Sequence, residues 1–142
     1  MKLSVSLFLK TIYTLSVIPD PQTMCGIFGF IGKKNAPNTL IHGLQKLEYR
    51  GYDSAGFVAG NTGELTLVKS VGKVSNLSQK AEKVLENGEN FSFGIAHTRW
   101  ATHGGVTEEN CHPHYSSNEK IYLVHNGIIE NYAELKEKLI AK

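Results

Sequence analysis

Cysteine and charge of a single sign are both scarce in this 142-residue sequence. Cys25 and Cys111 are the two cysteines, so at most one disulfide can form. That count excludes the disulfide framework of a small secreted domain and favours a reduced, cytoplasmic setting. The formal net charge of +2 is too small to indicate nucleic acid or an anionic membrane surface as a partner. Neither class of partner is therefore expected.

A long apolar run is also missing. The most apolar stretch lies in residues 1–24, but Lys10 interrupts it, and it falls short of the ~20 apolar residues that span a bilayer. The small-residue cleavage site of a secretory signal is missing as well. We expect residues 1–24 to be an extension foreign to the fold, either from a start codon chosen upstream of Met24 or as a propeptide. The domain is then expected to occupy residues 25–142.

What the sequence does contain, from Cys25 onward, is an alternation of short apolar segments and amphipathic ones. Gly63 is expected to supply the positive φ of a hairpin turn, and Asn38 and Ser75 are expected to cap helices. The glycine-interrupted segment 25–32 is expected to be a buried strand. The mixture of a hairpin with helices predicts an α+β fold rather than a purely parallel sheet. Strands are expected over residues 25–32, 54–60, 64–72, 91–99 and 120–127, and helices over 39–50, 76–85 and 131–142.

Polar residues gather where the expected strands begin or end. Each has an ordinary structural explanation when taken alone: Cys25 as a small buried apolar residue, and Asn126 with Gly127 as a tight turn. Considered together they form a known pattern. Five segments carry it, in this order: "MCGIFGFIG", "LQKLEYRGYDSAG", "GIAHTRWATHGG", "NCHPH" and "VHNGIIENYAELK".

These segments closely resemble the glutaminase domain of the glucosamine-6-phosphate synthase family. Its members are class II glutamine amidotransferases, within the N-terminal nucleophile hydrolases. The resemblance covers Met24 to Lys142. It implies a four-layer α/β/β/α sandwich, incomplete at the C-terminus of this sequence. It also implies hydrolysis of the side-chain amide of L-glutamine, with no metal and no cofactor.

The resemblance makes Cys25 the nucleophile, and elementary chemistry explains why it should come first in the mature chain. A thiol has a reference pKa of ~8.5 and needs a base near neutral pH. Its own α-amino group, with a reference pKa of ~7.7–8.0, can be that base, whereas an internal amide nitrogen cannot accept a proton. The resemblance further implies that Asn126 and Gly127 form the oxyanion hole and that Arg50 positions the nucleophile and its amine.

The remaining implied roles lie in the segment 99–103. Arg99 resembles the arginine that binds the glutamine α-carboxylate, which suits its planar fork. Thr102 and His103 resemble the rest of the glutamine pocket. Trp100 matches a tryptophan that gates the passage of ammonia to a partner domain.

In this family, ammonia passes to sugar-phosphate isomerase domains that convert fructose 6-phosphate to glucosamine 6-phosphate, and the full-length protein is expected to be a homo-oligomer. The isomerase domains are absent from this sequence, as is an aspartate that holds the substrate's α-amino group. Two alternatives stay open: a fragment of the same domain without turnover, and a Cys/His metal-binding module. The second would use Cys111, His112 and His114, with His97 and His103 nearby, although their spacing matches no established zinc site.

Overall fold

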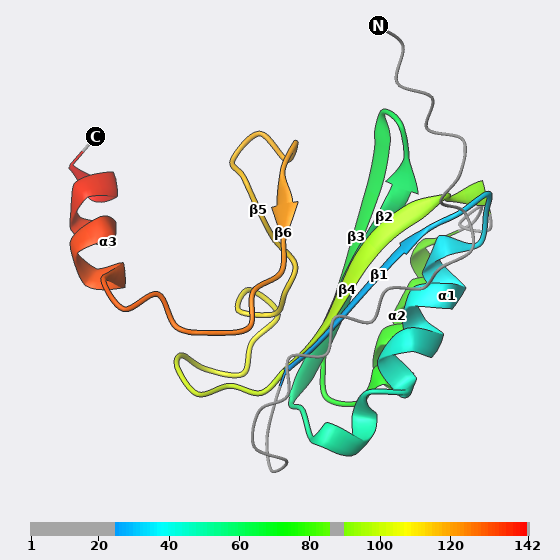
Figure 1. Ribbon diagram of the computed structural model, residues 1–142, viewed down its shortest axis with the longest axis horizontal. Coiled ribbons are helices and arrows are strands. Elements are labelled where there is room, and N and C mark those ends of the chain that lie inside the picture. Colours follow the sequence, from blue (N-terminus) through cyan, green and yellow to red (C-terminus); the bar gives the residue numbers. More distant parts are fainter. Residues whose placement is uncertain (1–24, 86–89, 142) are drawn as a thin grey trace, which may run out of the picture.

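The computed structural model describes residues 25–85 and 90–141, so the expected extension lies outside the described residues. Four strands form one antiparallel sheet in the order β1-β4-β2-β3, and β5 pairs with β6 in a separate small hairpin. The expected α+β class with an antiparallel sheet is confirmed (Figure 1). The elements are β1 (Gly26–Ile31), α1 (Ala36–Gln45), the 3-10 helix η1 (Glu48–Arg50), β2 (Ser54–Asn61), β3 (Glu64–Val71), α2 (Val74–Val84), β4 (Phe93–Arg99), β5 (His114–Tyr115), β6 (Tyr122–Leu123) and α3 (Tyr132–Ile140).

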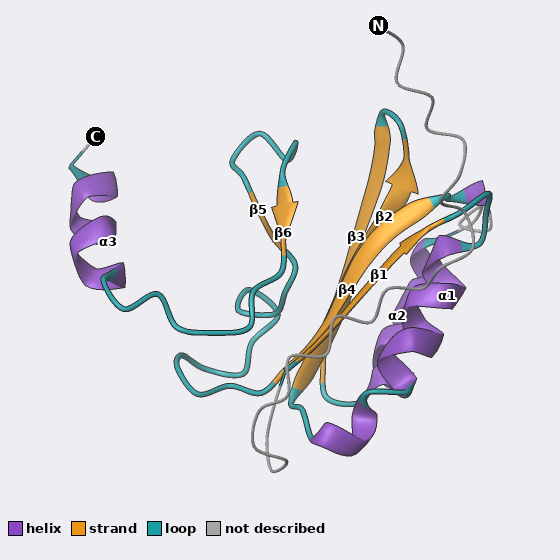
Figure 2. Cartoon of the chain, viewed as in Figure 1, coloured by secondary structure: helices purple, strands orange, loops and turns teal. Residues whose placement is uncertain are grey.

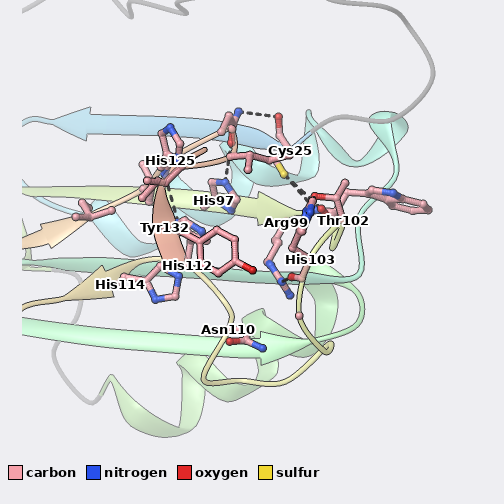
Figure 3. Close-up of a pocket in the computed structure, with 18 residues that line it drawn as sticks. Cys25, His97, Arg99, Thr102, His103, Asn110, His112, His114, His125 and Tyr132 are labelled. Atoms are coloured by element: carbon pink, nitrogen blue, oxygen red, sulfur yellow. Dashed lines mark hydrogen bonds between the residues drawn. The ribbon is translucent and has the colours of Figure 1, made fainter. Parts of the chain in front are cut away.

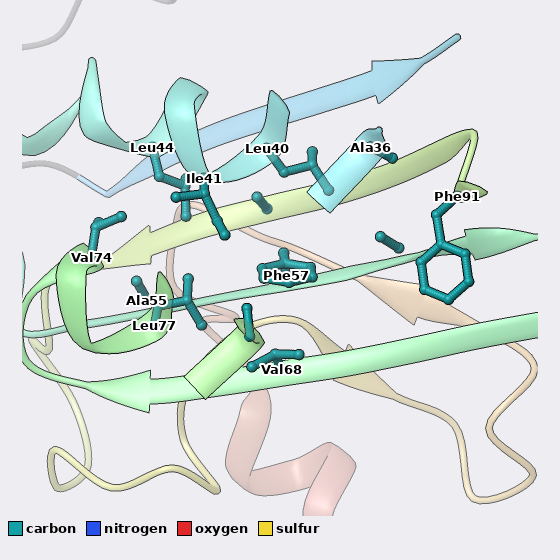
Figure 4. Packing of buried hydrophobic residues seen from close by; sticks show 13 residues of the cluster. Ala36, Leu40, Ile41, Leu44, Ala55, Phe57, Val68, Val74, Leu77 and Phe91 are labelled. Atoms are coloured by element: carbon teal, nitrogen blue, oxygen red, sulfur yellow. The ribbon is translucent and has the colours of Figure 1, made fainter. Parts of the chain in front are cut away.

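The hydrophobic core lies between the sheet and the two helices α1 and α2, which cover the same face of it (Figure 2). Leu40 and Leu44 of α1 and Leu77 of α2 pack there against Phe57 of β2, and all four side chains are fully buried (Figure 4). Burying a side chain of this kind contributes about 1.5–3 kcal/mol. This core holds α1 and α2 against the sheet, whose strand ends carry the polar residues expected to form the site.

The β2–β3 hairpin confirms the turn that the sequence predicts. Thr62 and Gly63 connect Asn61 to Glu64, which pair across the hairpin, and Gly63 has φ 90°. A side chain is strained at that angle, so glycine is the residue the turn requires. The other side of β2 pairs with β4, so β2 and β4 are the two central strands of the sheet.

The expectation of a fully buried first strand is wrong. β1 lies at the edge of the sheet and pairs with β4 alone among the described strands. Ile27 is 43% exposed and Ile31 is 76% exposed, while Phe28 and Phe30 pack against the core. Strand side chains alternate between the two faces, so one face of β1 meets α1 and the other does not.

Both expected helix caps are also wrong by a few residues. α1 begins earlier than expected, with Asn35 as its N-cap, and Asn38 instead donates a 2.8 Å hydrogen bond to the Asn35 side chain. α2 begins at Val74, whose N–H is satisfied by the Tyr52 hydroxyl at 2.9 Å rather than by Ser75. The acceptor at the start of α2 is thus the hydroxyl of Tyr52, which is distant in the sequence, and not the side chain of the neighbouring Ser75. None of the helices in the described part of the chain is long and apolar enough to cross a membrane.

The segment after β4 crosses to the side of the sheet that α1 and α2 do not cover (Figure 1). The expected strand 120–127 is reduced to the two residues of β6. The expected final helix is present as α3, but it has no buried residue, and Leu139 and Ile140 are 70% and 75% exposed. Residues 25–85 and 90–141 thus provide one sheet, one layer of two helices and a small hairpin beside the open face.

Candidate functional site

A pocket of about 980 Å³ lies between the end of β4, the segment before β1 and the chain around Asn126 (Figure 3). Its lining includes seven expected site residues: Cys25, Arg99, Trp100, Thr102, His103, Asn126 and Gly127. Seven of the eight site residues expected from the sequence therefore line one cavity, although they are up to 102 positions apart (Cys25 to Gly127, 127 minus 25). The volume is within the ~300–1,000 Å³ range of small-molecule sites.

Arg50 is the expected site residue that this pocket does not include. It is the last residue of η1, whereas the pocket lining begins with Cys25 and continues through β4. The following residue, Gly51, approaches the Trp100 ring: a Cβ built on it would lie 3.5 Å from Trp100 Cζ3. Arg50 is thus next to the wall of the pocket rather than in it.

The antiparallel pairing of β1 with β4 places Cys25 at the mouth of the pocket. Gly26 is opposite Thr98, and the Gly26 N–H donates to Thr98 Oγ1 at 3.0 Å. A Cβ on Gly26 would lie 2.8 Å from that oxygen and 2.7 Å from Leu47, so the close approach requires glycine here. Cys25 Sγ then accepts the Trp100 N–H at 3.3 Å, which holds the sulfur at the end of β4.

Asn126 reaches Cys25 from the opposite wall. Its Nδ2 donates to the Cys25 carbonyl oxygen at 3.0 Å, and its Oδ1 lies 2.7 Å from His97 Nε2. Gly127 follows with φ 150°, and a Cβ there would lie 3.0 Å from the His125 ring. A side-chain amide donor and a thiol therefore share one corner of the pocket.

Arg99 is the one arginine or lysine among the described residues that line the pocket. Its Nη2 donates to the His103 carbonyl at 2.7 Å and its Nη1 donates to the Gly105 carbonyl at 3.2 Å. These two bonds hold the loop that carries Thr102 and His103 around the guanidinium. His103 Nδ1 in turn lies 3.2 Å from Thr102 Oγ1. The remaining N–H groups of Arg99 are suited to an anionic ligand group.

The rings of three histidines, His97, His112 and His114, lie together in the pocket (Figure 3). His97 stacks on His112 with ring centroids 4.3 Å apart, and His112 meets His114 edge-on at 4.3 Å. Burial lowers the pKa of His97 to about 4 and the pKa of His112 to about 3, and it also lowers the pKa of His114. These three rings are therefore neutral at pH 7, and Arg99 is the one arginine or lysine of the described lining.

The sequence interpretation missed Asp53, which ties the start of β2 to the end of β4 beside the site. Its Oδ2 accepts the Ala101 N–H, its Oδ1 accepts the Ser54 hydroxyl at 2.8 Å, and its own N–H donates to the Arg99 carbonyl at 2.8 Å. The signal was present in "EYRGYDSAG": a carboxylate directly before a strand is an acceptor for the backbone of its neighbour. Asp53 thereby sets the exit angle of the chain after β4.

The metal-binding alternative finds no centre in the described part of the chain. No group of three or more His, Cys, Asp and Glu side chains there could hold a metal ion. Cys111 is fully buried, and its thiol faces the Thr107 carbonyl at 3.2 Å. The His112 ring stacks on His97 and meets His114 edge-on.

Comparison with curated proteins finds close relatives, although no protein-family model matches the chain. The chain is 52% identical over 118 residues to glutamine–fructose-6-phosphate aminotransferase (isomerizing) of Streptococcus pyogenes serotype M6, covering 83% of this chain and 19% of that protein. It is 57% identical over 120 residues to the protein of the same name from Bacteroides thetaiotaomicron, covering 84% and 19%. The chain thus spans about a fifth of the length of the curated relatives it matches.

Solved structures agree with this relationship. Glutamine phosphoribosylpyrophosphate amidotransferase from B. subtilis, in complex with ADP and GMP, matches with a TM-score of 0.66 and 32% identity over 81% of this chain and 24% of that chain. A structure described as the allosteric regulatory enzyme of purine biosynthesis matches with a TM-score of 0.68 and 33% identity, over 81% and 25%. The chain is therefore a homologue of the N-terminal region of glutamine–fructose-6-phosphate aminotransferase, and its structure matches part of a class II glutamine amidotransferase.

Proposed function

We propose that this chain, in the form that begins at Cys25, hydrolyses the side-chain amide of L-glutamine with Cys25 as the nucleophile. The thiol gives its proton to the α-amino group of Cys25, and the sulfur attacks the amide carbon to form a tetrahedral oxyanion. The intermediate collapses as the amine returns the proton to the leaving nitrogen, which departs as ammonia. Water then hydrolyses the thioester, releasing glutamate and restoring the thiol.

One observation carries the proposal: the Asn126 amide donates to the carbonyl of the very residue that bears the thiol. An Nδ2 group has two protons, and one is used at 3.0 Å to the Cys25 oxygen. The second is available for an oxyanion formed next to Sγ. The backbone N–H of Gly127 is the second proposed donor, as in other oxyanion holes built from an amide and a neighbouring backbone group.

Arg99 is proposed to bind the glutamine α-carboxylate. The described pocket lining supports this assignment, because it contains no other arginine or lysine and because burial keeps His97 and His112 uncharged near neutral pH. Thr102 and His103 are proposed to complete the glutamine pocket from the loop that Arg99 holds.

Arg50 and Trp100 are proposed to act at the rim. Trp100 is 40% exposed and lies directly after the strand that carries Arg99, so its ring can cover or open the pocket as ammonia leaves. Arg50 is proposed to position the amine of Cys25 from outside the pocket lining, through the η1 turn next to Trp100.

In the longer relatives, the name glutamine–fructose-6-phosphate aminotransferase (isomerizing) describes transfer of an amino group to fructose 6-phosphate. We infer that the ammonia released here serves that transfer when sugar-phosphate isomerase domains are joined to this region. We also infer that the open face of the sheet is one of the two inner faces of a four-layer α/β/β/α sandwich. The apolar side chains of Ile95, Val58 and Leu65 on that face support this inference.

The test is ammonia release from glutamine by protein that begins at Cys25, by the same protein preceded by residues 1–24, and by its Cys25→Ala variant. We expect activity in the first alone, because the extension converts the catalytic amine into an amide. Intact mass must accompany the assay to show which N-terminus is present. Full activity in a species that retains Met1 to Met24, or in Cys25→Ala, would overturn the proposal.

A further inference from the structure

The side chain of His97 contacts Asn126 within the pocket. It extends from β4, it is 1% exposed, and its Nε2 lies 2.7 Å from Asn126 Oδ1. Asn126 lies 29 positions further along the chain and directly before Gly127. Figure 3 shows His97 and Cys25 near each other in the pocket, and Asn126 makes a hydrogen bond to each of them.

The contacts of Asn126 fix which way its amide points. Its other end lies 3.0 Å from the Cys25 carbonyl oxygen, which can only accept a hydrogen bond. That end must therefore be the NH₂ group, and the end facing His97 must be the oxygen. An amide oxygen is an acceptor, so His97 must donate. His97 is therefore the tautomer with its proton on Nε2.

The surroundings of His97 favour that neutral tautomer. Nδ1 is buried and has no hydrogen-bond partner among the described residues, so a proton placed there would be unsatisfied. Burial also lowers the pKa of the ring to about 4, which keeps it uncharged near neutral pH. The neutral ring carries one proton, and the lack of a partner at Nδ1 favours placing that proton on Nε2.

His112 supports the same segment from a second point. Its ring stacks on His97 with an interplanar angle of 24°, and its Nδ1 accepts the backbone N–H of His125 at 3.3 Å. The residue before Asn126 is thus held by His112, while the Asn126 side chain is held by His97. Two stacked rings clamp consecutive residues of one short segment.

We propose that His97, backed by His112, is a positioning residue that fixes the orientation of the Asn126 amide, so that its NH₂ group faces Cys25. The catalytic consequence rests on the proposed function, in which Asn126 is an oxyanion donor. Without the Nε2–H donor the amide can turn over, which would place its oxygen against the Cys25 carbonyl and against the developing oxyanion. Two like dipoles would then face each other where one hydrogen bond stood.

The chain offers a matched pair of substitutions for a test. In His97→Gln the new NH₂ group can occupy the place of Nε2 and still donate to Asn126. In His97→Asn the side chain is one carbon shorter, so its amide lies near the former Nδ1 and falls short of Asn126. Both variants lose the stacking with His112, so that loss cancels in the comparison. His42→Asn, on the exposed side of α1, is the control for a histidine-to-amide change away from the pocket.

The first measurement does not depend on activity. In the isotope-labelled 142-residue chain, the nitrogen shifts of His97 should report a protonated Nε2 and an unprotonated Nδ1. The side-chain NH₂ signals of Asn126 should stay close to their wild-type positions in His97→Gln and move or broaden in His97→Asn. A proton on Nδ1, or Asn126 signals that are the same in all variants, would overturn the proposal whether or not the protein hydrolyses glutamine.

The second measurement is glutaminase kinetics of the same variants in the form that begins at Cys25. Deleting an oxyanion donor outright typically lowers kcat by ~100- to 1,000-fold, so a misplaced donor in His97→Asn should lower it by about 10- to 100-fold. KM should change little, because the lost interaction belongs to the transition state. His97→Gln should recover most of kcat, and His42→Asn should match the wild type. Equal losses in the Gln and Asn variants would reduce His97 to a packing role. Absence of glutaminase activity in the unsubstituted protein would refute the proposed function and leave the Asn126 signals to decide the positioning.

Discussion

Replacing Arg99 by lysine should weaken glutamine binding much more than it slows turnover. The guanidinium of Arg99 has five N–H donors. Two of its nitrogens hold the loop, through the His103 carbonyl at 2.7 Å and the Gly105 carbonyl at 3.2 Å. The donors that remain are sufficient for a two-point contact with a carboxylate. A lysine keeps the positive charge but has three donors on a single atom.

The magnitude follows from counting these donors. If the ammonium group in Arg99→Lys is to keep both loop carbonyls, one donor is left for the substrate, so one of two charge-assisted hydrogen bonds to the carboxylate is lost. A hydrogen bond to a charged group contributes ~1.5–3 kcal/mol. At 1.4 kcal/mol for each factor of ten, the glutamine KM should rise by roughly 10- to 150-fold. The kcat should change by much less, because the carboxylate contact is the same in the ground state and the transition state.

Steady-state ammonia release over a range of glutamine concentrations measures both constants. Lys138→Arg is the matched control, because it exchanges the same two residue types on exposed α3 and should leave KM unchanged. Urea unfolding of Arg99→Lys shows whether the loop has been lost instead. An unchanged KM in a stably folded variant would refute the assignment and move the carboxylate site elsewhere.

Three further predictions concern the nucleophile, the buried rings and the missed carboxylate. Cys25→Ala should abolish glutamine hydrolysis. Cys111→Ser should leave the rate within about twofold of wild type, since a serine hydroxyl can replace the buried thiol as a donor. Ammonia release by each variant measures both effects. The free energy of unfolding should fall as pH drops from ~6.5 toward 4, because in the fold the pKa of His97 is lowered to about 4 and that of His112 to about 3. In this range each of these rings takes up a proton in the unfolded chain but not in the fold, which lowers the free energy of unfolding by up to ~1.4 kcal/mol per pH unit for each ring. Urea unfolding at several pH values measures that slope, and a slope that is no smaller in His97→Gln would contradict the assignment. Asp53→Ala should lower the free energy of unfolding by about 2 kcal/mol, because the Ala101 N–H and the Ser54 hydroxyl lose their acceptor. A variant as stable as wild type would show that water replaces the carboxylate.

Local features were predictable because neighbouring residues cause them. Gly63 places a positive φ between two alternating strands, and the spacing of Leu40 and Leu44 gives α1 its buried side. The relationship to glutamine amidotransferases was predictable as well, since the ordered motifs are a property of the sequence itself. The helix starts were not: Asn38 and Ser75 satisfy the local rule for a cap, but neither position is where the helix begins.

Non-local pairing decided the rest. The sequence assigned Cys25 and Asn126, 101 positions apart, to one site only through the resemblance to a known family. In the structure, the pairing of β1 with β4 and the return of the chain over the open sheet face bring the Asn126 amide to 3.0 Å from the Cys25 carbonyl. The same pairing puts β1 at the sheet edge, which no period-two pattern can reveal, because alternation specifies the two faces of a strand and not its neighbours. His97 is the clearest case. Its residue type left a metal-ligand role open, although the spacing matched no established zinc site. Its proposed role as the donor to Asn126 follows only from the neighbours that the fold gives its ring.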